Sequence, residues 1–130
     1  MKKLFILLSA ILSLGIVSTV YAANTGDTNW SNEYRVWSPN DYTPARKKTN
    51  ATAYYNKVKT ITSINYINIW AALGNGTDVS AGRTYKAYKG DVTFLYNLAH
   101  ENYRGSTVRI DSRRIANGSS TGIWSPDSVR

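Results

Sequence analysis

Residues 107–113 read Thr-Val-Arg-Ile-Asp-Ser-Arg, and the alternation of apolar and polar side chains in this stretch decides the fold class. Val108 and Ile110 are expected to face one way, and the charged residues that separate and follow them the other. A period of two residues is typical of a β-strand with one buried and one solvated face. The stretch therefore predicts an antiparallel sheet with a core on one side.

The rest of the chain repeats this pattern in short runs. Thr, Val, Ile, Tyr and Trp recur between Gly, Asn, Asp and Pro, a composition that favours strands over long helices. The predicted strands are residues 33–37, 49–61, 64–73, 83–89, 92–99, 107–113 and 122–124. About seven short strands joined by turns predict an all-β fold, a small antiparallel β-sandwich.

One pair of strands carries more detailed expectations. Gly90-Asp91 separates residues 83–89 from residues 92–99 as a hairpin turn would, so we expect these two strands to pair. In the second strand, the apolar residues that share one parity and are predicted to face the core are Val92, Phe94, Tyr96 and Leu98.

The N-terminal segment has the pattern of a secretory signal. Lys2 and Lys3 precede an almost wholly apolar run that ends at Val20, and Tyr21-Ala22 completes a small-residue cleavage site. We predict that residues 1–22 are a cleaved signal peptide and that the protein is secreted or associated with the cell surface. An uncleaved membrane anchor is the alternative, because the run approaches the ~20 residues that span a bilayer.

The remaining chain is small and basic. The full sequence has 130 residues, no Cys, one His and a formal net charge of +8. Residues 23–32 are polar and lack an apolar period, which predicts a flexible N-terminal segment. Residues 33–130 are enough for a single β-sandwich domain, which without disulfides must rely on a well-packed core. The basic charge favours anionic partners.

Three patterns could indicate catalysis, and each lacks a part that it needs. Residues 118–122 match the Gly-x-Ser-x-Gly pattern of a serine nucleophile, but the Trp-Ser-Pro that follows cannot begin the required long helix. His100-Glu101 lacks the second His of a zinc peptidase. The eight carboxylates are scattered singly. We therefore predict that the protein is not an enzyme and uses no metal and no cofactor.

Aromatic and basic side chains alternate on the predicted outward faces, as on surfaces that bind polymers. Flat rings stack on sugars or bases, and Lys or Arg attracts phosphate or uronate in a salt-dependent manner. The predicted binding residues are Tyr55, Lys57, Lys59, Tyr66, Trp70, Arg109 and Arg113. The expected partner is an anionic cell-wall polymer, a glycan or a membrane surface, and nucleic acid is not expected. Cross-strand packing alone is the other explanation for exposed Tyr and Lys.

A short sequence motif occurs twice, once near each end of the domain. Residues 37–41 read Trp-Ser-Pro-Asn-Asp, and residues 124–128 read Trp-Ser-Pro-Asp-Ser. In one interpretation each Trp closes one end of the sandwich while the Pro turn stops the strand. In the other, the two corners contact a ligand.

Three segments carry a resemblance to known sequences. They are a basic Thr/Asn-rich strand from Arg46 to Thr52, a Glu-Asn-Tyr turn at residues 101–103, and the terminal Gly-x-Trp-Ser-Pro-Asp-Ser of residues 122–128. With the signal peptide before them, the chain resembles an uncharacterised family of small secreted proteins of Gram-positive bacteria. The resemblance implies a location outside the cell and a small β domain, and it implies no activity.

Together these patterns predict a secreted, non-enzymatic binding module at the bacterial envelope. The alternative is a bacteriocin-like secreted antibacterial protein, suggested by small size, export and cationic charge. The mature chain shows no long amphipathic helix for direct membrane insertion, which counts against this alternative. A matrix component that self-associates through edge strands is a third possibility.

Overall fold

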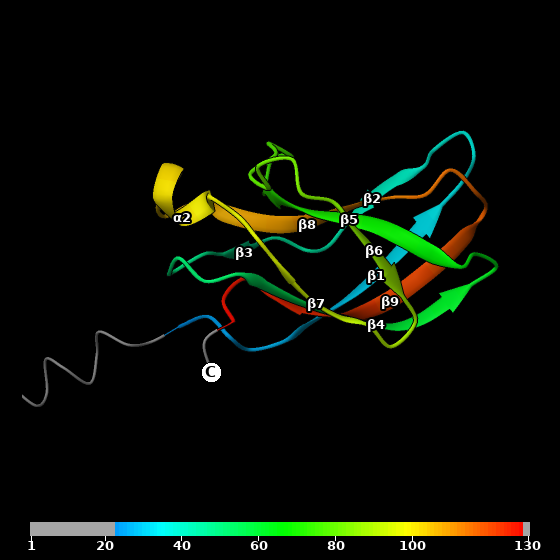
Figure 1. Cartoon of the computed structure of the whole chain (residues 1–130), viewed down its shortest axis with the longest axis horizontal. Helices are drawn as coiled ribbons and strands as arrows, with labels where there is room; N and C mark the ends of the chain where they lie inside the picture. The colour runs from blue at the N-terminus through cyan, green and yellow to red at the C-terminus, as the bar shows by residue number, and fades with distance from the viewer. Residues whose placement is uncertain (1–22, 129–130) are drawn as a thin grey trace, which may run out of the picture.

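Two antiparallel sheets pack face to face in the computed structural model, which describes residues 23–128 (Figure 1). The predicted signal peptide, residues 1–22, lies outside the described residues. The elements are β1 (Thr28–Tyr34), β2 (Asn40–Tyr42), β3 (Arg46–Lys47), β4 (Tyr54–Thr62), β5 (Tyr66–Leu73), β6 (Tyr85–Tyr88), β7 (Val92–Leu95), a short helix α2 (Ala99–Asn102), β8 (Thr107–Arg113) and β9 (Gly118–Ser125).

The first sheet has the strand order β1-β9-β4-β7, and the second has the order β2-β8-β5-β6 with β3 also paired to β8. Several pairs of strands that follow one another along the chain, such as β4 and β5 or β8 and β9, belong to different sheets, whereas β5 and β6 pair in one sheet. The chain therefore crosses repeatedly from one layer to the other. The all-β sandwich predicted from the alternation is confirmed.

The core between the sheets contains large aromatic side chains, and the polar atoms of Trp30, Tyr34 and Tyr54 have hydrogen-bond partners. Tyr34 and Trp124 are fully buried. The Tyr34 hydroxyl lies 2.8 Å from the hydroxyl of Ser112 in the second sheet, and Trp30 Nε1 donates to Asn56 Oδ1 at 2.9 Å. These hydrogen bonds satisfy the polar atoms of Trp30 and Tyr34, whereas Nε1 of the buried Trp124 ring has no hydrogen-bond partner within residues 23–128.

The predicted strand at residues 107–113 has the same bounds as β8, whereas the start of β1 was not predicted. Residues 107–113 form β8, with Val108 and Ile110 buried as predicted. Strand β1 begins at Thr28, inside the segment 23–32 that was expected to be flexible, so that prediction is wrong for residues 28–32. The buried residue Asn32 explains the miss, because a polar side chain interrupts the apolar period.

The predicted hairpin at Gly90 is wrong. Strand β6 pairs with β5, and β7 pairs with β4, so the turn connects the two sheets instead of two paired strands. The parity of β7 is also opposite to the prediction, because Leu95 is buried whereas Val92 and Phe94 are exposed, as is Tyr96. The prediction assumed that the apolar side chains of a strand face the core, whereas Val92 and Phe94 face outward.

The two Trp-Ser-Pro corners have different environments. Trp124 is fully buried, as a residue that closes the core must be. Trp37 is 83% exposed in the turn between β1 and β2. The interpretation that each Trp closes one end of the sandwich is therefore wrong for Trp37.

Candidate functional site

The outward face of the second sheet collects rings and cations from its four main strands. Every second residue of each strand points to this face. The register places Asp111 between Tyr42 and Trp70, and it places Tyr66 beside Tyr88, with ring centroids 5.6 Å apart. We call this surface the aromatic–basic face. Its residues are Tyr42, Tyr66, Trp70, Lys86, Tyr88, Arg109, Asp111 and Arg113, together with Arg114 next to β8.

Three of the cations lie over rings of this face. The Arg109 guanidinium carbon is 3.7 Å from the centroid of the Tyr42 ring. The Tyr66 ring is contacted by the Arg114 guanidinium at 4.2 Å and by Lys86 Nζ at 4.8 Å. Contacts of this kind contribute about 0.5–1 kcal/mol each at exposed sites. They order the cations at the surface before a ligand arrives.

One acid lies among these cations. Asp111 is the only acidic residue among the outward positions of β2, β5, β6 and β8. Its Oδ1 accepts a hydrogen bond from Arg109 Nε at 2.6 Å. Burial raises the pKa of Asp111, and the Arg109 partner offsets part of this effect. Arg113 donates to Asn40 Oδ1 at 2.8 Å and stays exposed, so the face keeps a positive excess.

The structure divides the seven predicted binding residues between two faces. Those on the aromatic–basic face are Tyr66, Trp70, Arg109 and Arg113. Those on β4 of the first sheet, away from this face, are Tyr55, Lys57 and Lys59. Alternation identified side chains that point outward, but it carried no information on the sheet to which each strand belongs. The seven residues therefore do not form one patch.

The outward side of the first sheet has a different chemistry. Strand β9, one of its two central strands, presents Ser119, Thr121 and Ile123, and the Thr121 hydroxyl lies 2.6 Å from that of Thr60. Lys59 lies at a register shift between Val58 and Thr60, which interrupts the alternation of β4. Hydroxyl side chains therefore lie on the same side as Tyr55, Lys57 and Phe94, whereas rings and guanidinium groups dominate the second sheet.

Besides Asp111, four residues of the aromatic–basic face were not among the predicted binding residues. Tyr42 belongs to a three-residue strand, which is too short for a periodic signal. Lys86 and Tyr88 share one parity in a predicted strand, so alternation could have identified them. Arg114 follows β8, and only its position over Tyr66 assigns it to the face.

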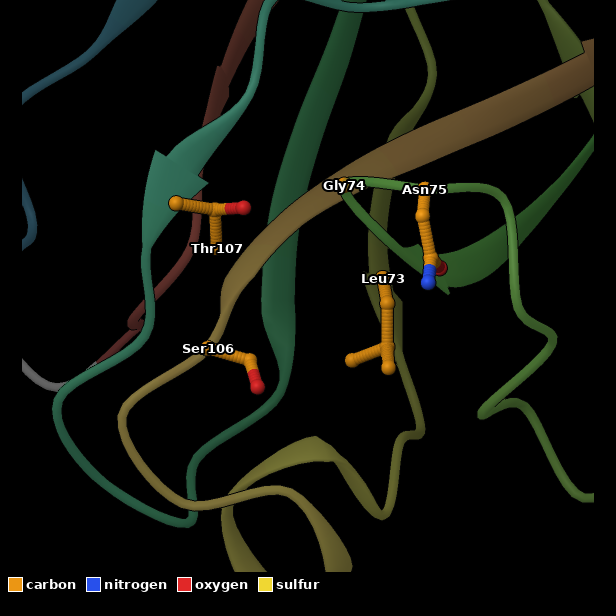
Figure 2. Close-up of a pocket in the computed structure, with 5 residues that line it drawn as sticks. All are labelled: Leu73, Gly74, Asn75, Ser106 and Thr107. Atoms are coloured by element: carbon orange, nitrogen blue, oxygen red, sulfur yellow. The ribbon is translucent and has the colours of Figure 1, made fainter.

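A shallow hollow of about 170 Å³ lies where the end of β5 meets the start of β8 (Figure 2). Leu73, Gly74 and Asn75 line it from the end of β5, and Ser106 and Thr107 line it from the start of β8. It is smaller than the roughly 300–1,000 Å³ of typical small-molecule sites. No ionisable side chain lines it, and within residues 23–128 no three His, Asp or Glu side chains gather where they could hold a metal ion. The sheet face is the stronger candidate.

One end of the sandwich exposes large apolar side chains. Val36 and Trp37, in the turn between β1 and β2, are 58% and 83% exposed, and Ile115, in the turn between β8 and β9, is 61% exposed. The Val36 N–H donates to Asn117 Oδ1 at 3.1 Å, which links the two turns at this end of the molecule (Figure 1). We call these three residues the apolar tip. In the described part of the chain, no helix has both the length and the apolar character to cross a membrane.

Comparison with protein-family models matched residues 18–128 to a family described as a protein of unknown function, DUF2712. The chain belongs to the DUF2712 family. This match covers the whole described sandwich and agrees with the resemblance to an uncharacterised family. Neither the curated proteins nor the solved structures gave a match. The candidate site of this DUF2712 protein is therefore argued from its geometry.

Proposed function

We propose that this DUF2712 protein is a secreted, non-enzymatic module that binds an anionic glycan polymer of the bacterial envelope on its aromatic–basic face. The observation that carries the proposal is the gathering of rings and cations on one side of one sheet. The same face holds a single acid, and Arg109 neutralises it. A polyanion would meet a net positive surface there.

The chemistry of the face suits a charged glycan. The apolar faces of Tyr and Trp rings pack against sugar rings, and a guanidinium group pairs with carboxylate or phosphate through two parallel hydrogen bonds. Four strands about 4.8 Å apart give a surface roughly 14 Å wide. An open surface of this kind fits an extended polymer better than a small enclosed ligand.

The proposal is tested by the binding of the purified mature chain to immobilised anionic wall polymer at increasing salt concentration. Affinity is expected to fall as salt rises, because the attraction is between exposed charges. Trp70→Ala and Arg113→Gln are each expected to weaken binding about fivefold, the effect of losing about 1 kcal/mol. Thermal melting of each variant shows whether the fold is retained.

Lys57→Gln is the matched control, because it removes one cation from the other sheet. It is expected to bind like the wild type. Equal losses in Lys57→Gln and Arg113→Gln would contradict the assignment to the second sheet. Binding that is independent of salt would contradict the electrostatic attraction. Tighter binding of DNA or RNA than of wall glycan would indicate that the ligand is a nucleic acid instead of a glycan.

The apolar tip favours a second candidate, a bacteriocin-like antibacterial protein that acts at the membrane of a neighbouring cell. Trp is enriched at membrane–water interfaces. Arg35 and Arg114 adjoin the exposed residues Val36 and Ile115 and would attract anionic lipid. Growth inhibition and vesicle leakage, measured with wild type and Trp37→Ser, test this function. Killing that Trp37→Ser loses would support it, and absence of both killing and leakage would exclude it.

A further inference from the structure

Lys48 and Asp127 form an ion pair inside the molecule. Lys48 Nζ lies 2.7 Å from Asp127 Oδ1, and the two side chains are 1% and 0% exposed. Lys48 follows β3, and Asp127 follows β9. The pair therefore joins the C-terminal end of the described chain to a segment far away in the sequence. Buried charges of this kind persist only when their partners are well placed.

The Asp127 carboxyl group is held asymmetrically. Its Oδ2 accepts hydrogen bonds from the backbone N–H of Asn24 at 2.9 Å and from the backbone N–H of Thr49 at 3.3 Å. The Thr49 hydroxyl donates to the same oxygen. Oδ1 faces Lys48. Donors gathered on one oxygen stabilise negative charge that develops there, as they do in enzymes that form tetrahedral intermediates.

The Lys48 amine is held with similar precision. Nζ donates to the carbonyl oxygens of Thr52 at 2.5 Å and Pro126 at 2.7 Å. These two acceptors match the two N–H bonds of a neutral amine, which leaves the third direction facing Asp127. Nζ is also 5.6 Å from the centroid of the Tyr54 ring. The amine therefore has a fixed orientation toward the carboxyl group.

The surroundings affect the two charges in opposite ways. Burial lowers the pKa of Lys48, while Asp127 and the more distant Glu101 raise it in part. Burial would raise the pKa of Asp127, but hydrogen bonds from Lys48, Thr49 and Asn24 outweigh it and lower this pKa. The resting pair is ionic, and it lies in a site where charge is costly. A neutral, covalent product would remove that cost.

We propose that Lys48 and Asp127 condense to an intramolecular amide crosslink between Nζ and Cγ. The Lys48 ammonium first passes a proton to Asp127 Oδ1. The Nζ electron pair then attacks Cγ, so that the N–C bond forms and Oδ2 carries the negative charge held by its donors. A second proton moves from Nζ to Oδ1, the Cγ–Oδ1 bond breaks, and one water leaves. The ion pair supplies every atom and proton that the reaction needs.

Such a crosslink would serve this domain as a disulfide serves other small secreted domains. The sequence contains no Cys. A covalent link between positions so far apart would restrict the unfolded chain strongly, as a disulfide does when it closes a long loop. The inference concerns stability and does not depend on polymer binding.

Intact-mass measurement of the folded and then denatured wild-type chain tests the crosslink. With the N-terminus fixed by sequencing, the expected mass is that of the sequence less one water molecule. Proteolysis is expected to release one branched peptide that contains Lys48 and Asp127. A wild-type chain at full mass after prolonged incubation, with the two peptides recovered separately, would overturn the proposal.

Lys48→Arg is the control, because it keeps a cation but cannot form the amide. It is expected to retain the full mass of its sequence. A loss of water that persists in Lys48→Arg would place the dehydration elsewhere in the chain and would also overturn the proposal.

Discussion

Gly122 in β9 has no room for a side chain. A Cβ atom there would lie 2.2 Å from the Lys57 carbonyl oxygen and 2.6 Å from the Trp30 ring. Gly122→Ala must therefore displace backbone or a core ring, and we expect it to lower the free energy of unfolding by roughly 1–3 kcal/mol or more. Urea denaturation measures the change. Gly26→Ala is the control, because its nearest neighbouring atom is 3.9 Å away, and equal losses in both variants would contradict the packing described.

Asp111 gives the aromatic–basic face a pH dependence. Burial raises its pKa above the ordinary value of 3.8, and Arg109 offsets part of this. Because the folded pKa is the higher one, the contribution of Asp111 to stability is full below the unfolded pKa and is lost as pH rises through the folded pKa. Arg109→Gln is expected to raise the pKa further. An NMR titration of the Asp111 carboxyl carbon measures it, and a midpoint below that of unfolded Asp would contradict the assignment.

The short strand β2 contributes to the face through Tyr42. Its ring lies under the Arg109 guanidinium, and the contact orders that cation. Tyr42→Ala is expected to weaken binding of anionic wall polymer about threefold, the effect of losing ~0.5–1 kcal/mol. Tyr103→Ala removes a similarly exposed ring next to α2 and is expected to bind like wild type. Equal affinities for Tyr42→Ala and wild type in equilibrium titrations would show that β2 is not part of the binding site.

The strand whose bounds were predicted to the residue is the one in which alternation is clearest. In β8, apolar and polar residues alternate from Thr107 to Asp111, and the predicted bounds match the structure. In β7, Phe94 faces outward against Tyr55, with ring centroids 5.8 Å apart, while Leu95 fills the core. A short run that is apolar at successive positions fits both parities. The pairing of β7 with β4 decides which parity faces the core, and residues distant in the sequence determine this pairing.

The arrangement of the strands in two sheets could not be inferred from the sequence. Consecutive strands often lie in different layers, so turn signals such as Gly90-Asp91 did not reveal pairing. For this reason the predicted binding residues separated into two groups. The contact between Lys48 and Asp127 was equally hidden, because both residues are charged and sequence patterns predict such residues on the surface.

At the scale of the whole molecule, the two sheets differ in the chemistry of their outward faces. One presents hydroxyl groups on β9, and the other presents rings with ordered cations. The most direct test is NMR chemical-shift mapping of residues 23–130 during titration with anionic wall polymer. The account predicts that the shifts concentrate on outward residues of β2, β5, β6 and β8, and that added salt reverses them. Shifts that concentrate on β4 and β9, or on the apolar tip, would contradict it.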